Sequence, residues 1–247
     1  MITFLLYNSG LELLNSLPEK LLKHPAIKND LRKRKKKPSE VLLDLAVHQS
    51  AFDSKDKLNR GRPDIVHQVL LQYLFSPLIH PSGNNQNSNL HLLIHTSSNK
   101  YFEIPSSWRP PLHYLRFRGL LEKLLHKRSL VVSEEDSITL ELGTVKQIIQ
   151  KVKPSSIINF TSHTASEPLS LHAFANFLTD HYKSPKMVLC LIGGYQHGKI
   201  PDSILKQLKE SKVKIHDVSL EGGRLPSWKV LSTSLQGIEW NLSRIDD

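Results

Sequence analysis

Cysteine is nearly absent from this chain, which has a single one, Cys190, among its 247 residues. One cysteine excludes an intramolecular disulfide, and such a composition is typical of proteins from a reducing compartment. Cys190 lies within a short apolar run that ends in glycines. We therefore expect a buried side chain rather than a nucleophile.

Long apolar runs are also missing. No stretch approaches the ~20 apolar residues that a membrane-spanning helix needs, and the amino end lacks the basic region, apolar core and small-residue cleavage site of a secretory signal. Hydrophobic residues make up 39% and charged residues 23% of the chain, which is ordinary for a soluble globular protein. The length allows one large domain or two small ones with a substantial core.

Several familiar catalytic motifs do not occur in the sequence. It contains no G-x-G-x-x-G, G-x-x-x-x-G-K-[ST], G-x-S-x-G or H-E-x-x-H string, so nothing supports a dinucleotide-binding protein, a P-loop enzyme, an α/β-hydrolase or a zincin. The 13 histidines show no paired metal-ligand spacing with Cys or Asp partners. We expect no metal site.

Positive charge is what the chain has in surplus. Its 33 lysines and arginines outnumber its 23 acidic residues, giving a net charge of +10 and a pI of about 9.6. A surplus of this size favours an anionic partner, and nucleic acid is the first candidate. An anionic membrane surface is the second, weakened by the lack of a basic amphipathic helix with bulky apolar anchors.

Short apolar runs alternate with segments of helical periodicity over most of the chain. From residue 129 onward the pattern is βαβαβα, which predicts a parallel sheet covered by helices on both faces. We expect one α/β domain over residues 1–247. Strands are expected at residues 2–7, 90–95, 130–132, 138–142, 156–160, 187–192 and 213–218, helices at 11–21, 64–75, 113–125, 145–152, 170–181, 201–210 and 227–240, and a short helix or strand at 39–48.

Small residues follow three of the predicted strands, at residues 161–162, 193–198 and 220–225. Loops after neighbouring parallel strands gather at one edge of a sheet, where ligands bind in open α/β folds. Glycine there lets the backbone approach a ligand closely. The alternative is a set of tight strand-to-helix turns without a ligand, and the two are about equally well supported for a lone glycine loop.

Basic residues concentrate in the first half of the chain. The run at about 28–38 ends in proline and is expected to be a flexible loop that reaches towards nucleic acid, and the polar loop at about 53–64 is a second insertion. The segment 109–127 mixes basic side chains with Tyr114 and Phe117. This mixture suits phosphate contacts and base stacking, but equally a solvated helix whose aromatic rings face the core.

Five segments taken together resemble a known family. They are the string Arg60-Gly-Arg-Pro-Asp-Ile-Val-His67, the strand at 90–96, Arg116-Phe-Arg-Gly-Leu120, Gly193-Gly-Tyr-Gln-His-Gly198 and the stretch 219–228. In this order, across nearly the whole chain, they resemble the Nep/Emg ribosome-biogenesis methyltransferases, which modify pseudouridine in small-subunit ribosomal RNA. The first string is the most distinctive of the five.

The resemblance implies a SPOUT-superfamily fold whose carboxyl-terminal part, about 156–247, forms a deep trefoil knot, an exception to the rule that chains do not thread their own loops. It also implies a homodimer that binds S-adenosyl-L-methionine within the knot. Carried over by motif, the cofactor-binding residues are Thr161, Gly193, Gly198, Leu220, Glu221, Gly222, Gly223, Arg224 and Leu225.

For RNA, the resemblance implies that Arg62 contacts the substrate and that Asp64 holds this arginine in place. A bidentate arginine–carboxylate pair orients the guanidinium. The family's R-x-P-R-x-x-x-R pattern matches Arg109 and Arg116 at its ends, but Leu112 stands at the middle arginine. Arg118 or Lys123 are candidates to replace that contact.

The implied reaction is transfer of a methyl group to ring nitrogen 1 of a pseudouridine in small-subunit ribosomal RNA. We assign Asp64 first the role of arginine orienter and second that of general base, because pairing with arginine stabilises the ionised carboxylate. Two alternatives stay open, namely a SPOUT methyltransferase with another RNA target and a non-catalytic rRNA-binding assembly factor. We expect a cytoplasmic protein, with the nucleolus as the alternative.

Overall fold

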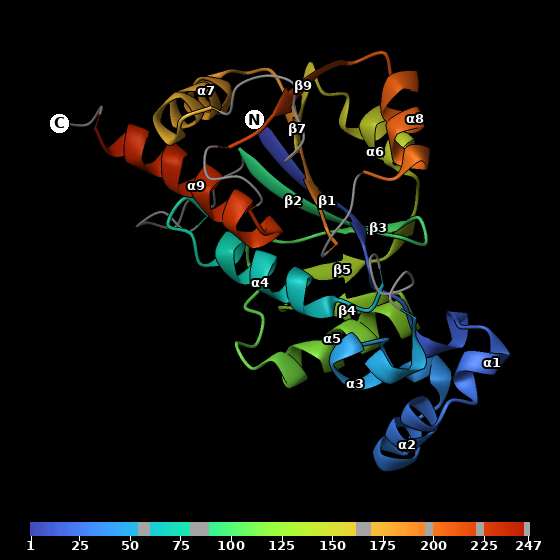
Figure 1. Ribbon diagram of the computed structural model, residues 1–247. Coiled ribbons are helices and arrows are strands. Elements are labelled where there is room, and N and C mark those ends of the chain that lie inside the picture. Colours follow the sequence, from blue (N-terminus) through green and yellow to red (C-terminus); the bar gives the residue numbers. More distant parts are fainter. Residues whose placement is uncertain (54–59, 80–88, 162–168, 196–199, 221–224, 245–247) are drawn as a thin grey trace.

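The computed structural model describes residues 1–53, 60–79, 89–161, 169–195, 200–220 and 225–244. Its centre is a seven-stranded sheet in the order β6-β3-β2-β1-β8-β7-β9 (Figure 1). Neighbouring strands from β2 to β9 in this order run parallel, whereas β3 and β6 are antiparallel additions at one edge. The strands are β1 (Ile2–Ser9), β2 (Leu90–Thr96), β3 (Lys100–Glu103), β6 (Glu141–Leu142), β7 (Ser156–Phe160), β8 (Val188–Gly193) and β9 (Lys214–Val218).

Helices cover both faces of the sheet, as the alternation predicts. One face packs against α4 (Pro63–Leu74), α5 (Tyr114–Lys127), α7 (Leu171–Lys183) and α9 (Ser227–Ser243). The opposite face packs against α6 (Val145–Val152) and α8 (Asp202–Glu210), and the two sets stand on either side of the sheet in Figure 1. Side chains alternate along β1, so that Phe4 enters the first core and Leu5 the second.

A third, smaller apolar cluster lies among the short elements that follow β1. These are η1 (Leu14–Ser16), α1 (Glu19–Leu22), α2 (Pro25–Arg34), η2 (Pro38–Glu40), α3 (Leu45–His48) and η3 (Gln49–Ala51). The predicted helix over 11–21 is wrong, because Pro18 interrupts it. Leu14, Leu17 and Leu21 reach this cluster from η1, irregular chain and α1, whereas Leu11 and Leu13 pack in the first core. The ambiguous segment 39–48 ends in the short helix α3.

The basic run at 28–38 is not the flexible loop that its composition predicts. Most of it belongs to α2, which starts with Pro25 at its first position, where proline is favoured. The His24 side chain accepts a hydrogen bond from the Ala26 amide at 3.3 Å and so caps the helix. Ile27 is fully buried in the third cluster and anchors the helix to the rest of the molecule.

The predicted strand at 138–142 is two strands in two sheets. β5 (Ser137–Thr139) pairs with β4 (Ser129–Val131) in a separate two-stranded sheet, and β6 pairs with β3. Strand β3 was not expected from the sequence. The other predicted strands and helices are confirmed within a few residues at their ends, and Cys190 is buried as expected. Among the described helices, none is long and apolar enough to cross a membrane.

Candidate functional site

The ends of β7 and β9 lie side by side, as predicted for the small-residue segments that follow them. Thr161, directly after β7, donates its amide to the carbonyl of Val218 at 3.0 Å. The Leu169 amide donates to the carbonyl of Ser219 at 2.9 Å, and Leu169 forms a parallel bridge with Leu220. Since β8 is the other neighbour of β7, all three predicted segments begin at one edge of the sheet.

Gly193, the last residue of β8, contacts the start of α9. The Ser227 hydroxyl donates a hydrogen bond to the Gly193 carbonyl. Ser227 comes two residues after Leu225, so the end of the third segment meets the beginning of the second. Thr161, Gly193, Leu220 and Leu225 are named here the strand-end cluster, and the structure places them at this one edge. The predicted residues Gly198, Glu221, Gly222, Gly223 and Arg224 lie outside the described residues.

Gly194 shows that packing within the chain also demands glycine here. Its amide donates to the Tyr7 carbonyl at 2.7 Å, which ties the turn after β8 to the end of β1. A Cβ atom at this position would lie 2.9 Å from the Ser9 Cα atom and 3.0 Å from the Tyr7 carbonyl oxygen. The tight-turn explanation therefore accounts for Gly194. Packing favours glycine at position 193 as well, since a Cβ atom there would lie 3.0 Å from the Tyr195 ring.

At this edge, the side-chain oxygen of Asn159 is a buried acceptor without a hydrogen-bond partner among the described residues. Asn159, two residues before Thr161, donates its side-chain amide to the Asp217 carboxylate at 2.7 Å. An orphaned acceptor of this kind commonly marks a place where a ligand or water completes the hydrogen bonding. Small residues, strand-end backbone and an orphaned acceptor fit a nucleoside-like cofactor.

The distinctive Arg60–His67 string reaches the same edge of the sheet. Gly10, directly after β1, lies so close to it that an added Cβ atom would be 2.9 Å from the Arg60 carbonyl carbon. The Arg60 guanidinium donates two hydrogen bonds of 2.6 Å to the Glu12 carboxylate, which holds the segment against the chain after β1. Because Gly194 contacts the end of β1 as well, the string and the strand-end cluster lie on one side of the molecule.

Arg62 and Asp64 form the bidentate pair that the resemblance implies. The Arg62 Nε and Nη2 atoms donate to the two Asp64 carboxylate oxygens at 2.8 and 2.7 Å. Hydrogen bonding to Asp64 is the main reason that the pKa of Arg62 is raised above its ordinary value. The side chains remain 25% and 37% exposed, so the oriented guanidinium can still be reached from solvent. The chain turns into α4 at this point, with Pro63 at its first position.

His67 connects the string to the second group of predicted RNA-binding residues. Its Nε2 atom lies 2.9 Å from the Pro111 carbonyl oxygen, and its ring stacks on Phe117 with 4.3 Å between the centroids. These contacts fix the connector that carries Arg109 and the start of the helix that carries Arg116. Both arginines are exposed.

Comparison with known proteins decides the family. The model of the family described as EMG1/NEP1 methyltransferase matches residues 4–239. The chain belongs to the EMG1/NEP1 methyltransferase family. The resemblance inferred from the five segments is thereby confirmed.

Other members of the EMG1/NEP1 family match over nearly the full length of both chains. The ribosomal RNA small subunit methyltransferase Nep1 of Pyrococcus furiosus is 32% identical over 236 residues, 95% of each chain. Its counterpart from Staphylothermus marinus is 33% identical over 241 residues, 96% of this chain and 95% of the relative. A crystal structure of Archaeoglobus fulgidus Nep1 bound to S-adenosylhomocysteine covers 98% of both chains with a TM-score of 0.75 and 28% identity.

One suggestion drawn from the EMG1/NEP1 pattern is wrong. Arg118 cannot replace the arginine missing at Leu112, because it turns inward and pairs with the buried Asp44 at 3.2 Å. Leu112 is 71% exposed, so the position itself is open to a partner. Lys123 is exposed and stays a candidate to replace the missing arginine.

The aromatic residues of α5 favour the core explanation over base stacking. Phe117 is fully buried, and the Tyr114 hydroxyl donates to the Asp44 carboxylate at 2.7 Å. Burial, followed by this hydrogen bond, raises the pKa of Tyr114 above its ordinary value. Arg116, which is exposed, therefore stays the predicted RNA-binding residue of this helix segment.

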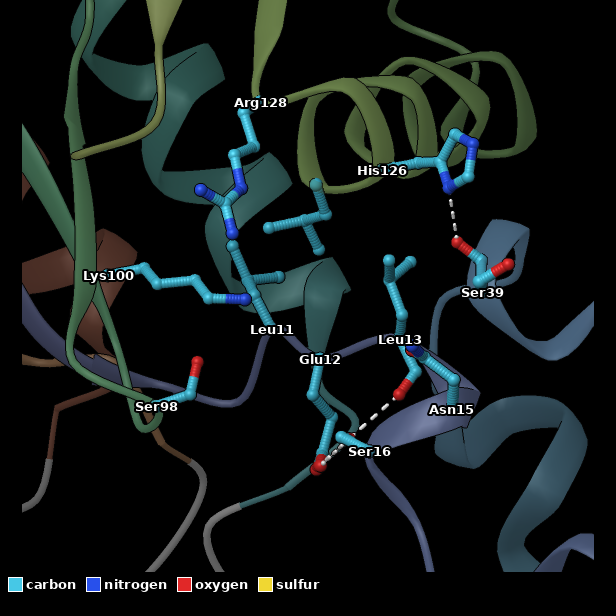
Figure 2. A pocket seen from close by; sticks show the side chains of 11 residues that line it. Leu11, Glu12, Leu13, Asn15, Ser16, Ser39, Ser98, Lys100, His126 and Arg128 are labelled. Carbon is cyan, nitrogen blue, oxygen red and sulfur yellow. Dashed lines mark hydrogen bonds between the residues drawn. The ribbon is translucent and has the colours of Figure 1, made fainter. Parts of the chain in front are cut away.

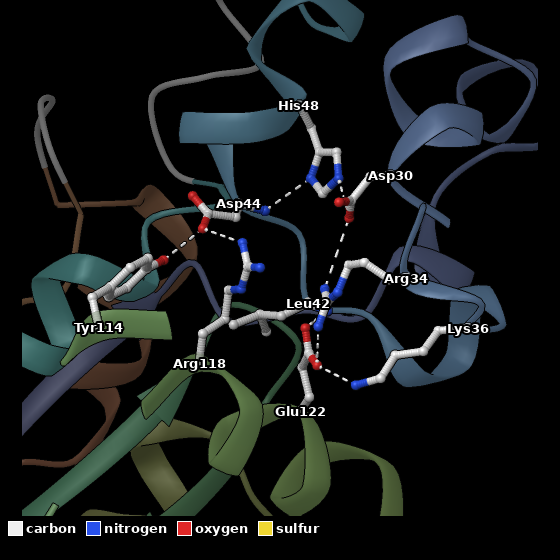
Figure 3. A network of polar contacts seen from close by, with 9 residues as sticks. All are labelled: Asp30, Arg34, Lys36, Leu42, Asp44, His48, Tyr114, Arg118 and Glu122. Atoms are coloured by element: carbon white, nitrogen blue, oxygen red, sulfur yellow. Dashed lines mark hydrogen bonds and ion pairs between the residues drawn. The ribbon is translucent and has the colours of Figure 1, made fainter. Parts of the chain in front are cut away.

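A network of polar contacts links α5 to α2, and the sequence analysis missed its acidic members (Figure 3). Glu122 is 2% exposed and accepts hydrogen bonds from Arg34 at 2.6 Å and from Lys36 at 2.8 Å. Burial alone would raise the pKa of Glu122, but the two cations outweigh it and lower the pKa. At the other end, Asp44 accepts from Tyr114 and Arg118. The sequence did contain a signal for these residues, because Asp44 and Glu122 each stand inside a leucine-rich segment, where an acidic side chain needs a buried partner.

This network limits what the basic run can do. Arg34 and Lys36 are engaged by Glu122, so they are not the mobile phosphate-binding arm that the sequence suggested. Lys28, Arg32, Lys33 and Lys35 are exposed on or beside α2. The region at 28–38 therefore presents a rigid positive helix, while residues 54–59 of the second predicted insertion lie outside the described residues.

The described residues form no metal site, and two cavities lie elsewhere on their surface than the strand-end cluster. No group of three or more His, Cys, Asp or Glu side chains within the described ranges is arranged to hold a metal ion. One cavity, of about 310 Å³, lies beside the chain that follows β1 (Figure 2). The other, of about 270 Å³, lies beside α6. Neither is lined by a member of the strand-end cluster.

Proposed function

We propose that the protein is an S-adenosyl-L-methionine-dependent methyltransferase acting on ring nitrogen 1 of a pseudouridine in small-subunit ribosomal RNA, and that it takes part in assembly of the small subunit. The observation that carries this proposal is the position of two features at one edge of the sheet. The oriented Arg62–Asp64 pair and the strand-end cluster both lie there, within reach of a common substrate.

Support for the cofactor comes from the strand-end cluster and from the relatives. Gly193, Leu220, Leu225 and Thr161 would hold the cofactor largely through backbone groups, together with residues 198 and 221–224 of the same loops. The bound S-adenosylhomocysteine of the Archaeoglobus fulgidus protein is the demethylated form of the proposed cofactor. When bound, S-adenosyl-L-methionine supplies the methyl group.

Support for the RNA contact comes from the geometry of Arg62. Asp64 holds the guanidinium at two points, and the remaining N–H groups can donate to a phosphate or a base edge. Because the side chain is already ordered, binding costs it little conformational entropy. Both carboxylate oxygens of Asp64 are engaged by this arginine. Asp64 is thus better placed to orient Arg62 than to accept a proton as a general base. Arg109 and Arg116 would contact further phosphates. The His67–Pro111 contact holds the connector that carries Arg109, and the start of the helix that carries Arg116, close to Arg62.

The proposed target follows from the chemistry of the base. Ring nitrogen 1 carries a proton in pseudouridine, whereas in uridine it carries the bond to the sugar. Methylation at this atom therefore requires prior isomerisation. The contribution of the chain would be to hold an extruded base in line with the methyl group, with Arg62 fixing the strand on which it lies.

We further propose a homodimer with a carboxyl-terminal trefoil knot at about 156–247, located in the cytoplasm. Support for the dimer is the resemblance to the family and the exposure of two large apolar side chains on adjacent helices, Leu171 at 53% and Trp240 at 63%. Contiguous exposed apolar surface is typical of faces that are covered in an assembly. The knot stays a prediction, because residues 162–168 and 221–224 lie outside the described residues.

Methyl transfer to matched RNAs tests the proposed function. Two synthetic stem-loops would differ only in carrying pseudouridine or uridine at one loop position, and labelled methyl incorporation would be measured with S-adenosyl-L-methionine. We expect incorporation into the pseudouridine RNA alone. Equal activity on both would exclude attack at ring nitrogen 1 and favour another RNA target. Failure to bind S-adenosylhomocysteine in a calorimetric titration would instead favour a non-catalytic assembly factor.

A further inference from the structure

We propose that the cavity beside the chain after β1 is a second phosphate-binding subsite for the RNA, separate from the Arg62 contact. This inference rests on the proposed function, since it needs an RNA ligand. The cavity measures about 310 Å³ and lies between the segment 11–16, the turn between β2 and β3, and the carboxyl end of α5 (Figure 2). It is lined by Leu11, Glu12, Leu13, Asn15, Ser16, Ser39, Ser98, Lys100, Leu125, His126 and Arg128.

Two cations from different elements carry the argument. Lys100 begins β3 and Arg128 follows the last turn of α5, and both side chains extend into the cavity in Figure 2. Neither charged group has an ion pair or hydrogen bond among the described residues. The other basic side chains closest to the core, such as Arg34 and Arg118, are paired. Two converging cations without a carboxylate partner are suited to bind a phosphate group.

The backbone around Arg128 is held in place. Arg128 adopts a left-handed conformation with φ of 61°, and its carbonyl accepts a hydrogen bond from the Leu140 amide at 2.9 Å. Lys100 is similarly fixed, because its amide donates to the Thr96 hydroxyl at 3.1 Å. The two side chains therefore start from rigid positions on different elements, which reduces the entropy lost when they close on one anion.

Among the described residues that line the cavity, Glu12 is the only one with a carboxylate, and its charge is already neutralised. Glu12 accepts two hydrogen bonds of 2.6 Å from Arg60 and one of 2.9 Å from the Ser16 hydroxyl. His126 lies 2.8 Å from the Ser39 carbonyl through its Nδ1 atom, so this nitrogen carries a proton. The charge balance within the cavity thus favours an anion, with the Asn15 amide as a neutral donor in its lining.

The same Glu12–Arg60 pair places the cavity along the expected path of the RNA. Arg60 stands two residues before Arg62, and Glu12 forms part of the cavity wall. An RNA strand held by Arg62 can therefore continue past this pair towards Lys100 and Arg128. A phosphate suits the cavity better than a base, because His126 carries the only aromatic ring among the described lining residues on which a base would stack.

The test compares RNA binding by two variants that lose equal charge. The first is Lys100→Gln with Arg128→Gln. The control is Lys206→Gln with Lys209→Gln, both exposed on α8 at the other face of the sheet. The probe is the pseudouridine stem-loop, and affinity is measured over a series of salt concentrations. We expect the first variant to bind about 10- to 100-fold more weakly, with a salt slope smaller by about 0.7 for each phosphate that the variant no longer binds. The control should keep the slope of the unaltered protein.

A second measurement locates the phosphate and separates this inference from the proposed function. Neutral methylphosphonate linkages are introduced one at a time along the stem-loop, and one of them should weaken binding to the unaltered protein but not to the Lys100/Arg128 variant. If every linkage has the same effect on both proteins, or if the salt slope of the variant equals that of the control, the subsite does not exist. If the unaltered protein binds no RNA, the proposed function fails instead. Equal titrations with S-adenosylhomocysteine would show that both variants are folded.

Discussion

The Nε2 atom of His67 lies 2.9 Å from the carbonyl oxygen of Pro111, and through this contact α4 holds the connector that precedes α5. A carbonyl accepts, so Nε2 carries the proton in this hydrogen bond. His67 belongs to α4, and the string that contains it also contains Arg62. A single helix thus sets the position of Arg62 at its start and of Arg109 and Arg116 through the connector.

Replacing His67 should therefore affect RNA binding without removing an RNA contact. His67→Phe keeps an aromatic ring to stack on Phe117 but leaves the Pro111 carbonyl without its donor, at an expected cost of about 1–3 kcal/mol in the free energy of unfolding. RNA affinity should fall as well, because Arg109 and Arg116 are no longer held at a fixed spacing from Arg62. Chemical denaturation and RNA titration would measure the two effects. His67→Gln, which retains a donor, should recover part of both, and no recovery would contradict the positioning role.

The Arg62–Asp64 pair leads to a graded prediction. Arg62→Ala should weaken RNA binding about 10- to 100-fold, the loss expected for charge-assisted hydrogen bonds of about 1.5–3 kcal/mol. Arg62→Lys should recover little of it, because lysine lacks the planar fork that Asp64 holds. The RNA affinity of Asp64→Asn should lie between that of the two Arg62 variants and that of the unaltered protein. Titration with S-adenosylhomocysteine should give the same affinity for all of them, and a parallel loss of both ligands would indicate misfolding.

The sequence predicted the buried parallel strands because their apolar runs are continuous. β1, β7 and β8 are covered on both faces, so most of their side chains are apolar and the signal is strong. β3 gives no such signal, since it has four residues with Lys100 and Glu103 at its ends and lies near the sheet edge. The leucines at 11–21 misled for a related reason. Their spacing serves two cores, since Leu11 and Leu13 pack in the first core and the later leucines in the small third cluster.

Long-range polar pairing accounts for what the sequence could not predict in the candidate site. Composition identifies the basic run, but not that Glu122, 88 residues from Arg34, would anchor it. Arg118 likewise looked exposed because its partner Asp44 is 74 residues away. Arg62 and Asp64 were predictable because their partners are two residues apart and the string that holds them is distinctive. A motif was thus enough to predict the local pair. Only the structure shows whether a single basic side chain points to solvent or to a distant acidic partner.

Gly194 provides a test of the tight turn after β8. Gly194→Ala would place a Cβ atom 2.9 Å from the Ser9 Cα atom, and backbone on both sides must shift, at a cost of about 1–3 kcal/mol. Gly119→Ala is the matched control, since nothing lies within 4 Å of an added Cβ there and alanine favours the helix. Thermal unfolding should show a lower Tm for the first variant and an equal or higher Tm for the second. An unchanged Tm for Gly194→Ala would contradict the close approach.

His48 should make the stability of the protein depend on pH. Its side chain is fully buried, its Nδ1 atom accepts from the Asp44 amide at 3.1 Å, and its Nε2 atom lies 3.3 Å from the Asp30 carboxylate. Burial is the main cause that lowers the pKa of His48 below its ordinary value of 6.5, against the opposing effect of Asp30 and Asp44. The unfolded chain therefore binds the proton first. Stability is fully present above about pH 6.5 and is lost as the pH falls from there towards the lower folded pKa.

Denaturation curves collected between about pH 7 and pH 5 measure this contribution, in a range where histidine is the ordinary side chain that titrates. His48→Gln should be less stable at neutral pH but should lose less stability on acidification. Glu122 and Arg34 remain paired over this range, because the pKa of Glu122 is lowered and that of Arg34 is raised. Identical pH profiles for the variant and the unaltered protein would show that His48 does not titrate with folding.

Leu112 marks the place where this chain departs from the arginine pattern of its family, and it allows a gain of function to be tested. The side chain is 71% exposed, so Leu112→Arg should leave the free energy of unfolding nearly unchanged. The new guanidinium would stand between Arg109 and Arg116 on the connector that His67 holds. One added phosphate contact should raise RNA affinity about 3- to 10-fold and make the salt slope steeper by about 0.7. Leu142→Arg adds the same charge at an equally exposed position on the edge strand β6, so it should produce no such change. Equal gains in both variants would mean that net charge, and not the arginine row, determines the affinity.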